Sequence, residues 1–419
     1  MDDAAVTTLR ARFPALARTG ADGRPLVFAD APGGSQTPDS VIDAITGHLR
    51  YGASNTHGAF ETSRVTDRLI AEAHVAGADL LGADPDEIVF GANTTTLLLH
   101  LSRSFARTIG PGDEIVVTRL DHDANIRPWI LAAEDSGATV RWVDVCDEDA
   151  TLDEASFDAA LSDRTKLVAF TLASNAVGTI TPATELIRRA TQAGAIVAVD
   201  GVHLAQHRSI DLRALGADLV TSSPYKYFGP HQGVLAVRRA TLDAWRPYKL
   251  RPVDDTNPDR WETGTQNHEA MAGTIAAIDY IASVGTTYGS PTDATRRAAI
   301  RAGFAEIEEH ERALAIRFLE GIAGIDRVRL YGIAGSDRVG ERTPTFALRV
   351  GDEHPIATAE ALGDRGIFVW DGHYYAIELY DRLGLNDTGG AVRIGFCHYH
   401  TTAEVDRVLD TLADLARRA

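Results

Sequence analysis

The sequence predicts an α/β protein, with a mostly parallel seven-stranded sheet in a large domain and a smaller α+β domain at the C-terminus. Two observations support this prediction. Short apolar runs alternate with amphipathic stretches between about residues 85 and 240, and after about residue 265 long helical segments replace that alternation. Strands that are apolar on both faces and separated by helices are typical of a parallel sheet covered on both sides.

Composition limits the class of protein. The 419 residues, 44% of them hydrophobic, are typical of a globular chain of two or three domains. A net charge of −18 argues against a nucleic-acid-binding face. Two cysteines cannot build a disulfide framework, and the chain shows neither a signal-peptide core nor an apolar run of membrane-helix length. We therefore expect a cytoplasmic enzyme that binds neither nucleic acid nor membranes.

Seven apolar runs predict the strands of the large sheet, and segments between them have helical spacing. The strands are expected at 87–90, 113–118, 139–145, 166–172, 195–200, 217–222 and 233–238. Helices are expected at 94–106, 153–162 and 182–194. The last of these begins with Pro182 and ends with Gly194, residues that commonly open and close a helix.

The chain after residue 265 predicts a second, α+β domain. Its helices are expected at 267–285, 292–324 and 403–419, and its strands at 327–332, 343–350, 366–370 and 391–396. We divide the chain into an N-terminal segment of residues 1–30 that packs with the small domain, a large domain of residues 31–280 and a small domain of residues 281–419.

Polar side chains follow the predicted strands, at the edge where parallel sheets bind their ligands. Thr94 and Thr95 lie in the turn "GANTTT" before a helix, which suits a phosphate site or an ordinary helix cap. His122 follows the second strand and Asn175 follows the fourth. A ligand-binding role and a structural role both stay open for these two side chains.

Two further strands lead to an acid and to a lysine. Asp200 ends the fifth strand, and His203 lies three residues later. The stretch "SSPYKYFGPHQGVL" at the end of the sixth strand contains Ser223, Tyr225 and Lys226. A solvated surface residue is the alternative for Lys226. A lysine, a carboxylate and a phosphate site together are what pyridoxal 5'-phosphate (PLP) requires, whereas a nicotinamide cofactor would need a G-x-G-x-x-G sequence that is missing after the first strands.

Several motifs also occur together and in a fixed order from about residue 27 to the C-terminus. They are "VFADAPGGSQTP", "DHDANIRPW", "SNAVGT", "VDGVH", "SSPYKYFGPHQGVL", "WETGTQN" and "AVRIGFCHYHTTAEVDRVL". Their order resembles the class V aminotransferases, which are fold-type-I PLP enzymes, and in particular the cysteine desulfurase-like branch. The resemblance implies the PLP-dependent transferase fold of type I.

The resemblance implies a catalytic role for three residues. Lys226 would form the Schiff base with PLP and later move protons at the substrate's α-carbon. Asp200 would pair with the pyridinium nitrogen of the cofactor, and His122 would stack on its ring.

Other residues would hold the cofactor. By resemblance, Thr94, Thr95 and Ser223 would bind its phosphate. Asn175 would contact the side of the ring, and His203, at a position where relatives carry glutamine, would donate to the ring hydroxyl.

The remaining matches concern the substrate and the second subunit. Thr265 matches a residue that reaches the phosphate from the other subunit, which implies a homodimer with active sites at the interface. Arg393 matches the arginine that binds the substrate α-carboxylate, a task suited to a bidentate guanidinium; a solvated arginine on an edge strand is the alternative. Tyr225 stands beside the lysine where many desulfurases carry histidine, and His57 matches a position near the substrate entrance.

The segment that carries the nucleophilic cysteine in desulfurases is different here. It reads "WDGHYYAIEL", with Tyr375 at the cysteine position. His373 and Tyr375 are expected to bind substrate or act as general acids, and packing of their rings is the alternative. Cys146 follows a strand, and Cys397 is expected to be a buried structural thiol, with a displaced sulfur role left open.

These features predict a PLP-dependent enzyme that acts on a small amino acid through a carbanion at the α-carbon. The favoured reaction is β-elimination by a C–S lyase that forms no persulfide. A class V aminotransferase and an amino-acid or peptide epimerase stay open, because no motif determines which bond at the α-carbon breaks. A non-catalytic binding protein of the same fold is a further alternative. No metal is expected.

Overall fold

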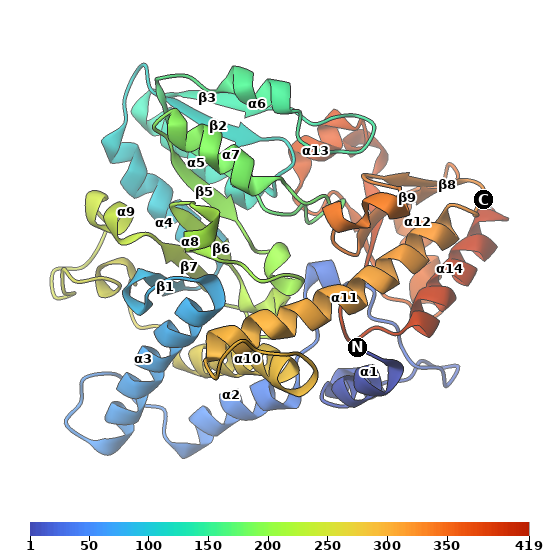
Figure 1. Ribbon diagram of the computed structural model, residues 1–419, viewed down its shortest axis with the longest axis horizontal. Helices are drawn as coiled ribbons and strands as arrows, with labels where there is room; N and C mark the ends of the chain where they lie inside the picture. The colour runs from blue at the N-terminus through green and yellow to red at the C-terminus, as the bar shows by residue number, and fades with distance from the viewer. Residues whose placement is uncertain (419) are drawn as a thin grey trace.

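A seven-stranded sheet forms the centre of the larger part of the molecule in the computed structural model, which describes residues 1–418 (Figure 1). Its strand order is β1-β7-β6-β5-β4-β2-β3. Strands β2 to β6 pair in parallel with one another, whereas β7 is antiparallel to β1 and β6. The strands are β1 (Ile88–Gly91), β2 (Glu114–Thr118), β3 (Thr139–Val143), β4 (Thr165–Thr171), β5 (Ile196–Asp200), β6 (Leu219–Ser222) and β7 (Gly233–Val237). All lie close to their predicted positions.

The helices of the described chain also follow the predicted pattern where a prediction was made. They are α1 (Asp3–Arg10), α2 (Asp39–Tyr51), α3 (Glu61–Leu81), α4 (Thr94–Phe105), α5 (Arg127–Ser136), α6 (Glu154–Ala160), α7 (Ala183–Gln192), α8 (Leu212–Leu215), α9 (Arg239–Ala244), α10 (His268–Tyr288), α11 (Arg296–Ile322), α12 (Pro355–Gly363), α13 (Ile377–Arg382) and α14 (Thr402–Ala416). The helix expected at 403–419 thus corresponds to α14, and its last predicted position, residue 419, lies outside the described residues.

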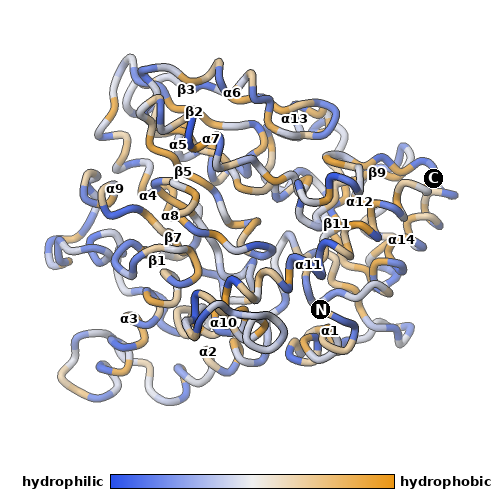
Figure 2. The backbone as a smooth tube through the Cα atoms, viewed as in Figure 1, coloured by the Kyte–Doolittle hydropathy of each residue, from blue (hydrophilic) through white to orange (hydrophobic). Residues whose placement is uncertain are grey.

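Alternate residues of each strand face different layers of helices. On β4, Val168 and Phe170 belong to a buried cluster with α3, α7 and α10. Their neighbours Leu167 and Ala169 belong to a second cluster with α4 and α5. Figure 2 shows hydrophobic residues along the inner strands and helices. Both faces of the sheet are therefore apolar because both are covered.

Helices α10 and α11 connect the large sheet to the small domain, and they pack at very short range. A Cβ atom at Gly285 would lie 1.9 Å from the carbonyl oxygen of Ala299, and one at Gly303 would lie 2.2 Å from that of Ile281. Glycine is therefore required at both positions. The far half of α11, including Phe318, packs in the core of the small sheet, so one rigid helix spans both parts (Figure 1).

The small sheet is antiparallel, with strand order β10-β11-β9-β8. Its strands are β8 (Val328–Tyr331), β9 (Thr345–Val350), β10 (Trp370–Gly372) and β11 (Ala391–Gly395). The strand predicted at 366–370 is wrong in position, because Ile367 forms an isolated parallel bridge with Val27 and the ladder with β11 begins at Trp370. β11 lies between two neighbours, so Arg393 is on an interior strand and not on an edge.

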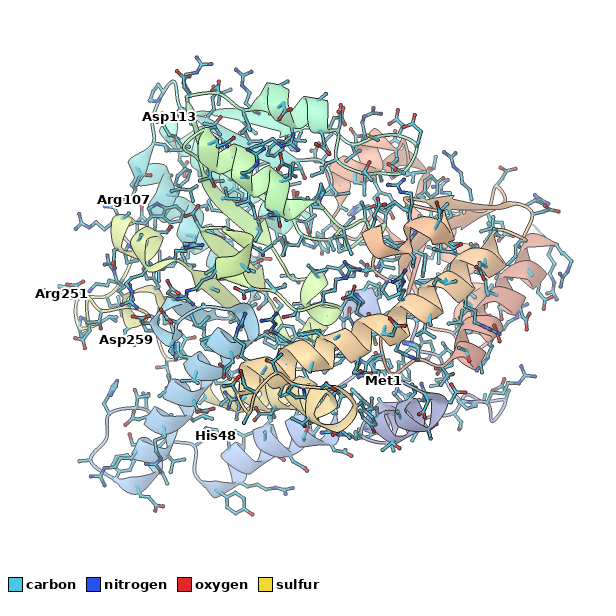
Figure 3. All side chains as sticks on the ribbon, in the orientation of Figure 1. Met1, His48, Arg107, Asp113, Arg251 and Asp259 are labelled. Atoms are coloured by element: carbon cyan, nitrogen blue, oxygen red, sulfur yellow. The ribbon has the colours of Figure 1, made fainter. Side chains whose placement is uncertain are left out.

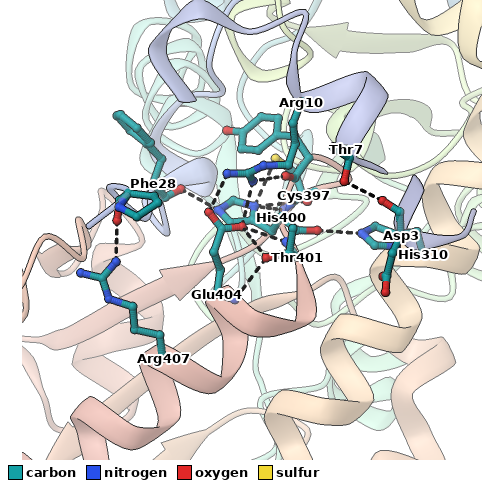
Figure 4. A network of polar contacts seen from close by, with 12 residues as sticks. Asp3, Thr7, Arg10, Phe28, His310, Cys397, His400, Thr401, Glu404 and Arg407 are labelled. Atoms are coloured by element: carbon teal, nitrogen blue, oxygen red, sulfur yellow. Dashed lines mark hydrogen bonds and ion pairs between the residues drawn. The ribbon is translucent and has the colours of Figure 1, made fainter. Parts of the chain in front are cut away.

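The first thirty residues contact the small sheet and its helix α14. Arg10 forms an ion pair with Glu404 of α14 at 2.8 Å, and the Nε2 atom of His400 donates to the carbonyl oxygen of Phe28 at 3.1 Å (Figure 4). These contacts place the N-terminal segment against the C-terminal part of the chain.

Charged side chains occupy the outside of the molecule. Figure 3 shows Arg107, Asp113 and Arg251 at its periphery. Among residues 1–418, no helix combines the length and the apolar character that crossing a membrane requires.

Candidate active site

A cavity of about 550 Å³ opens at the carboxyl ends of the parallel strands, between the large and the small sheet. Side chains from both sheets line it. Twelve of the residues singled out in the sequence are among them: Thr94, Thr95, His122, Asn175, Asp200, His203, Ser223, Tyr225, Lys226, His373, Tyr375 and Arg393. The fold therefore brings together residues that are up to three hundred positions apart in the sequence.

The N-terminus of α4 forms one wall of this cavity. Asn93 caps the helix with its side chain, and the N–H groups of the first turn, at Thr94 and Thr95, have no partner within the helix itself. The hydroxyls of Thr94 and Ser223 are 2.7 Å apart. Gly233 of β7 fixes the helix start, since a Cβ atom there would lie 2.5 Å from the carbonyl carbon of Asn93. This wall offers N–H and hydroxyl donors together with the positive end of a helix dipole, which suits a phosphate.

Asp200 ends β5 on the floor of the cavity. Its Oδ1 atom accepts hydrogen bonds from the backbone N–H of Val202 at 2.8 Å and from the hydroxyl of Thr221 at 3.0 Å. Burial raises the pKa of this carboxyl, and the two hydrogen bonds oppose that effect. Asp121 lies near it and is wholly buried, so that its pKa rises to about 8. A cation bound beside Asp200 would lower its pKa again and stabilise the carboxylate.

Lys226 lies just beyond β6 and is only 7% exposed. Its Nζ atom is 4.9 Å from the centre of the Tyr225 ring. The pKa of Lys226 is lowered to about 7, mainly by burial and also by the positive charge of Arg393, while the negative charge of Asp200 acts against both. Much of this lysine is therefore an uncharged amine near neutral pH, the form that attacks a carbonyl group.

His122 follows β2 and lines the cavity. Its Nδ1 atom accepts a hydrogen bond from the backbone N–H of Ala124 at 3.0 Å. Burial lowers the pKa of His122 to about 4, and the charges of Lys226 and Arg393 add to the effect. The ring is therefore neutral at physiological pH, and its centre lies 5.4 Å from that of Tyr375.

His203 connects the floor of the cavity to the small sheet. Its Nε2 atom lies 3.1 Å from the hydroxyls of both Thr343 and Thr345. Burial holds the pKa of His203 well below its usual range, and the neighbouring His207 adds to this effect. The Nδ1 atom is buried and has no hydrogen-bond partner among the described residues.

Arg393 enters the cavity from the small sheet. It is buried, donates to the carbonyl oxygen of Asn175 at 2.8 Å and lies with its guanidinium carbon 4.2 Å from the centre of the Tyr374 ring. The side-chain amide of Asn175 in turn donates to the carbonyl oxygen of Tyr374 at 3.0 Å. The arginine is thus oriented by an aromatic face and a backbone oxygen before any ligand binds.

The cavity fits a PLP molecule with an amino-acid substrate. Three of its side chains have a buried polar atom without a partner in residues 1–418: Oδ1 of Asn175, Nδ1 of His203 and Nε of Arg393. Such atoms are rare in folded proteins unless a ligand or water satisfies them. A mostly uncharged lysine, a buried carboxylate, a neutral imidazole and a phosphate-binding helix start complete the set that PLP needs.

Comparisons with known proteins agree with this chemistry. The family model described as Aminotransferase class-V matches residues 27–408. This chain belongs to that family. A cysteine desulfurase of an Enterobacter species is 33% identical over 97% of both chains, and a probable cysteine desulfurase of Mycobacterium leprae is 32% identical over 96% of this chain and 95% of its own. The apo structure of a cysteine desulfurase from Thermococcus onnurineus superposes with a TM-score of 0.86 at 27% identity, covering 99% of this chain and 98% of that one.

Membership of the class V family establishes the cofactor and the fold. The protein is a cysteine desulfurase-like PLP-dependent enzyme of fold type I, with the mostly parallel large sheet and the smaller second sheet described above. The sequence prediction of family, fold class and cofactor is therefore confirmed.

The structure does not bring two of the predicted site residues into the cavity. His57 is exposed in a tight turn, with its backbone N–H bound to Asp67 at 3.0 Å, and it does not line the site within this chain. Thr265 lines a separate hollow of about 310 Å³ next to α4, with His100 and Trp261. Thr265 is predicted to act on the site of a partner subunit. Its position within one chain does not test that prediction.

Neither cysteine lines the cavity in the described chain. Cys397 is buried next to His400, 3.8 Å from its Nδ1 atom, in the network of Figure 4. Burial raises the pKa of this thiol well above its usual range, and the negative charge of Glu311 adds to the effect. The position expected for a nucleophilic cysteine carries Tyr375, which does line the site.

Gly33, Trp370 and Asp371 are among the lining residues of the cavity that sequence reasoning did not assign to the site. Trp370 gave no chemical signal because it ends an apolar run that predicts a strand. Gly33 carried one signal, since it lies in the "APGG" turn of a matched motif. A Cβ atom at Gly33 would lie 2.3 Å from Nε1 of Trp370, so the glycine makes room for that ring.

Proposed function

We propose that the protein is a C–S lyase that eliminates a thiol from a cysteine-type amino acid without forming a persulfide on the enzyme. One observation carries this proposal. The cavity combines Lys226 with a phosphate-binding helix start, yet no cysteine lines it in residues 1–418, and Tyr375 occupies the turn where a desulfurase presents its nucleophile. A desulfurase needs a thiolate to accept sulfur, whereas elimination needs only a base at the α-carbon.

The reaction is balanced by one water molecule. The α-carbon of an S-substituted cysteine loses its proton, and the bond between the β-carbon and sulfur breaks with its electron pair leaving on sulfur as a thiolate. The thiolate takes up a proton, and hydrolysis of the remaining enamine gives pyruvate and ammonium. No oxidant or reductant is required.

Three residues act directly in this proposal. Bound PLP supplies an aldehyde for the substrate amine and an electron-accepting ring. Lys226 is the residue that would hold this aldehyde, and once released its Nζ atom would accept the substrate's α-proton, a role that its lowered pKa favours. Asp200 would pair with the ring nitrogen and favour its protonated form. His122, as a neutral ring over the site, stacks on the cofactor.

The remaining residues bind and orient. Thr94, Thr95 and Ser223 bind the phosphate, which suits their place at the N-terminus of α4. Asn175 and His203 contact the edge of the ring with the buried atoms that lack a partner in the described chain.

The substrate is oriented from the small sheet. Arg393 binds the α-carboxylate with a guanidinium that the surrounding protein has already fixed, which reduces the entropy lost on binding. His373 and Tyr375 contact the substrate side chain, and Tyr225 shapes the wall beside the lysine. His57 is proposed to act near the substrate entrance.

We also propose a cytoplasmic homodimer in which Thr265 of each subunit serves the phosphate site of the other. Its place in a hollow beside α4, outside its own chain's cavity, is compatible with this arrangement. The domain division proposed is residues 1–30, 31–280 and 281–419, and the contacts of Arg10 and Phe28 with the small domain support the first boundary.

The decisive experiment measures pyruvate and ammonia from L-cysteine, L-cystine and S-alkyl-L-cysteines. We expect equal amounts of pyruvate and ammonia, with release of hydrogen sulfide from cysteine, of thiocysteine from cystine and of the alkanethiol from an S-alkyl-cysteine. A variant with both Cys146→Ser and Cys397→Ala should keep this activity, because elimination needs no enzyme thiol. Lys226→Ala should abolish it, and borohydride should attach a pyridoxyl group to Lys226 only in the parent protein.

Three outcomes would contradict the proposal. Loss of activity in the cysteine-free variant, with normal folding and cofactor absorbance, would indicate persulfide chemistry. Exchange of amino groups between amino acids without pyruvate release from any thioether would favour transamination. Loss of optical activity in the recovered substrate would favour epimerisation.

A further inference from the structure

We propose that the mouth of the cavity selects amino acids whose β-carbon carries an uncharged aromatic or bulky apolar group, and that Trp370 and Tyr375 form the binding surface for that group. The substrate class that follows, an S-aryl or S-benzyl cysteine, rests on the proposed elimination. The preference for an aromatic side chain concerns binding alone and applies to any amino acid that enters the site.

Two partly exposed aromatic rings line the cavity. Tyr375 is 65% exposed and lies beside His122, while Trp370 is 52% exposed and lies beside Gly33. Large exposed aromatic side chains next to a cavity are typical of ligand-binding surfaces, because their rings bury much area when an apolar group covers them.

The turn that contains Tyr375 has a strained backbone. Tyr374 and Tyr375 have φ angles of +53° and +61°, a backbone region that residues other than glycine rarely adopt. Such conformations persist only where surrounding contacts fix them, and they are concentrated at functional sites.

Contacts from both domains fix this turn. The carbonyl oxygen of Tyr375 accepts from the backbone N–H of Asp123 at 2.8 Å, and that of Tyr374 accepts from the side chain of Asn175 at 3.0 Å. The Tyr374 hydroxyl also donates to the carbonyl oxygen of Ala391. The position of the Tyr375 ring at the mouth is therefore fixed by contacts of the turn's backbone and of Tyr374, and the Tyr375 side chain itself takes no part in them.

The charges of the cavity exclude acidic side chains. Lys226 and Arg393 are the lysine and the arginine among the described lining residues, and the cofactor and the α-carboxylate use both. Asp371 adds a carboxylate to the lining next to Trp370. An acidic group at the substrate's β-carbon would therefore meet one like charge and no lysine or arginine that is free to pair with it, whereas an uncharged ring would meet two aromatic side chains.

The test uses the PLP-loaded enzyme and amino acids without a β-carbon leaving group. L-phenylalanine, L-alanine and L-aspartate are titrated by stopped-flow, and dissociation constants are taken from the rapid change in cofactor absorbance. We expect L-phenylalanine to bind at least about tenfold more tightly than L-alanine, and L-aspartate to bind most weakly. Trp370→Ala and Tyr375→Ala should each reduce the phenylalanine-to-alanine affinity ratio by about threefold or more, and Tyr375→Phe, which keeps the ring, should preserve the ratio.

Equal affinities for L-phenylalanine and L-alanine in the parent protein, or a ratio that neither alanine variant changes, would overturn the inference. Because these ligands lack a thiol to eliminate, the result does not depend on the reaction. Failure to form pyruvate from any thioether would overturn the proposed elimination while an aromatic preference in the titration still supported this inference.

Discussion

At the scale of single residues, the charge of Lys226 is the property on which the site depends. Its pKa is lowered to about 7 by burial and by Arg393, against an ordinary value of 10.5. The uncharged fraction of the amine therefore rises with pH through about 7 and is nearly complete at pH values where an exposed lysine is still charged. The rate at which the apo-protein takes up PLP should rise about tenfold per pH unit below this midpoint and level off above it.

The measurement is the visible absorbance of the cofactor after mixing with apo-protein across a range of pH. A blocked lysine in free solution, measured with the same cofactor, is the control, and its midpoint should lie near the ordinary lysine value of about 10.4. Lys226→Ala should give no covalent absorbance at any pH. A protein midpoint that coincides with that of the free lysine would contradict the assigned environment.

Sequence patterns predict which residues form the site better than they predict the burial and pKa of those residues. Lys226, Asp200 and His122 are found because each directly follows a predicted strand, where a parallel sheet binds ligands. The raised pKa of Asp121 is not predictable, since it arises from burial among segments far apart in the chain. The same is true of the exposure of His57, which depends on a turn closed by the distant Asp67.

At the scale of elements, the start of α4 is fixed by its neighbour β7. A Cβ atom at Gly233 would lie 2.5 to 2.8 Å from backbone atoms of Asn93 and Thr94. Gly233→Ala should therefore displace the phosphate-binding turn, cost about 1–3 kcal/mol of stability and weaken PLP binding by about tenfold or more. Thermal unfolding of the apo-protein and equilibrium titration with PLP measure the two effects.

Gly110→Ala is the matched control. Gly110 has no neighbour within 4 Å of a Cβ atom and no left-handed backbone, so this substitution should leave both the unfolding temperature and PLP affinity nearly unchanged. If Gly233→Ala behaved in the same way, β7 would not position the helix start.

The boundaries of helices and strands could be predicted where the local sequence pattern determines them. They could not be predicted where pairing with a distant segment of the chain determines them. Apart from the edge strand β3, whose Thr139 and Arg141 are exposed, the strands of the large sheet are buried along most of their length, so their apolar composition identifies them. The strand expected at 366–370 failed because Ile367 pairs with Val27, a contact that local sequence does not encode. The place of Arg393 on an interior strand depends in the same way on strand order.

At the scale of the whole molecule, Arg342 joins the two sheets from within. It is buried, and its guanidinium donates to the carbonyl oxygens of Val177 in the large domain and of Ile333 and Thr345 in the small one. Burial lowers its pKa to about 9. Arg342→Lys should cost about 3 kcal/mol, because an ammonium group cannot reach these carbonyls together and each one left unpaired is costly.

Urea unfolding followed by circular dichroism measures this cost. Arg338→Ala, at a partly exposed arginine that pairs with Asp149 at 2.7 Å, is the nearby control and should change stability by about 1 kcal/mol or less. Equal effects of the two substitutions would show that Arg342 does not bridge the sheets.

The proposed dimer allows a test that depends on which chain supplies Thr265. Within one chain, Thr265 lines a hollow beside Ala92 and Thr96, while Thr94 and Thr95 of the same helix start line the cavity. If Thr265 acts on the partner's phosphate site, a mixed dimer of Lys226→Ala and Thr265→Ala subunits contains one site with both residues intact and one site with neither. The two variants are unfolded and refolded together in equal amounts, so that random pairing makes about half of all dimers mixed. Because each mixed dimer has one intact site out of two, about a quarter of all sites should be active, and the mixture should show about a quarter of the parental activity. If Thr265 serves its own chain, no site in the mixture has both residues, and mixing should give no more activity than the Thr265→Ala subunits alone.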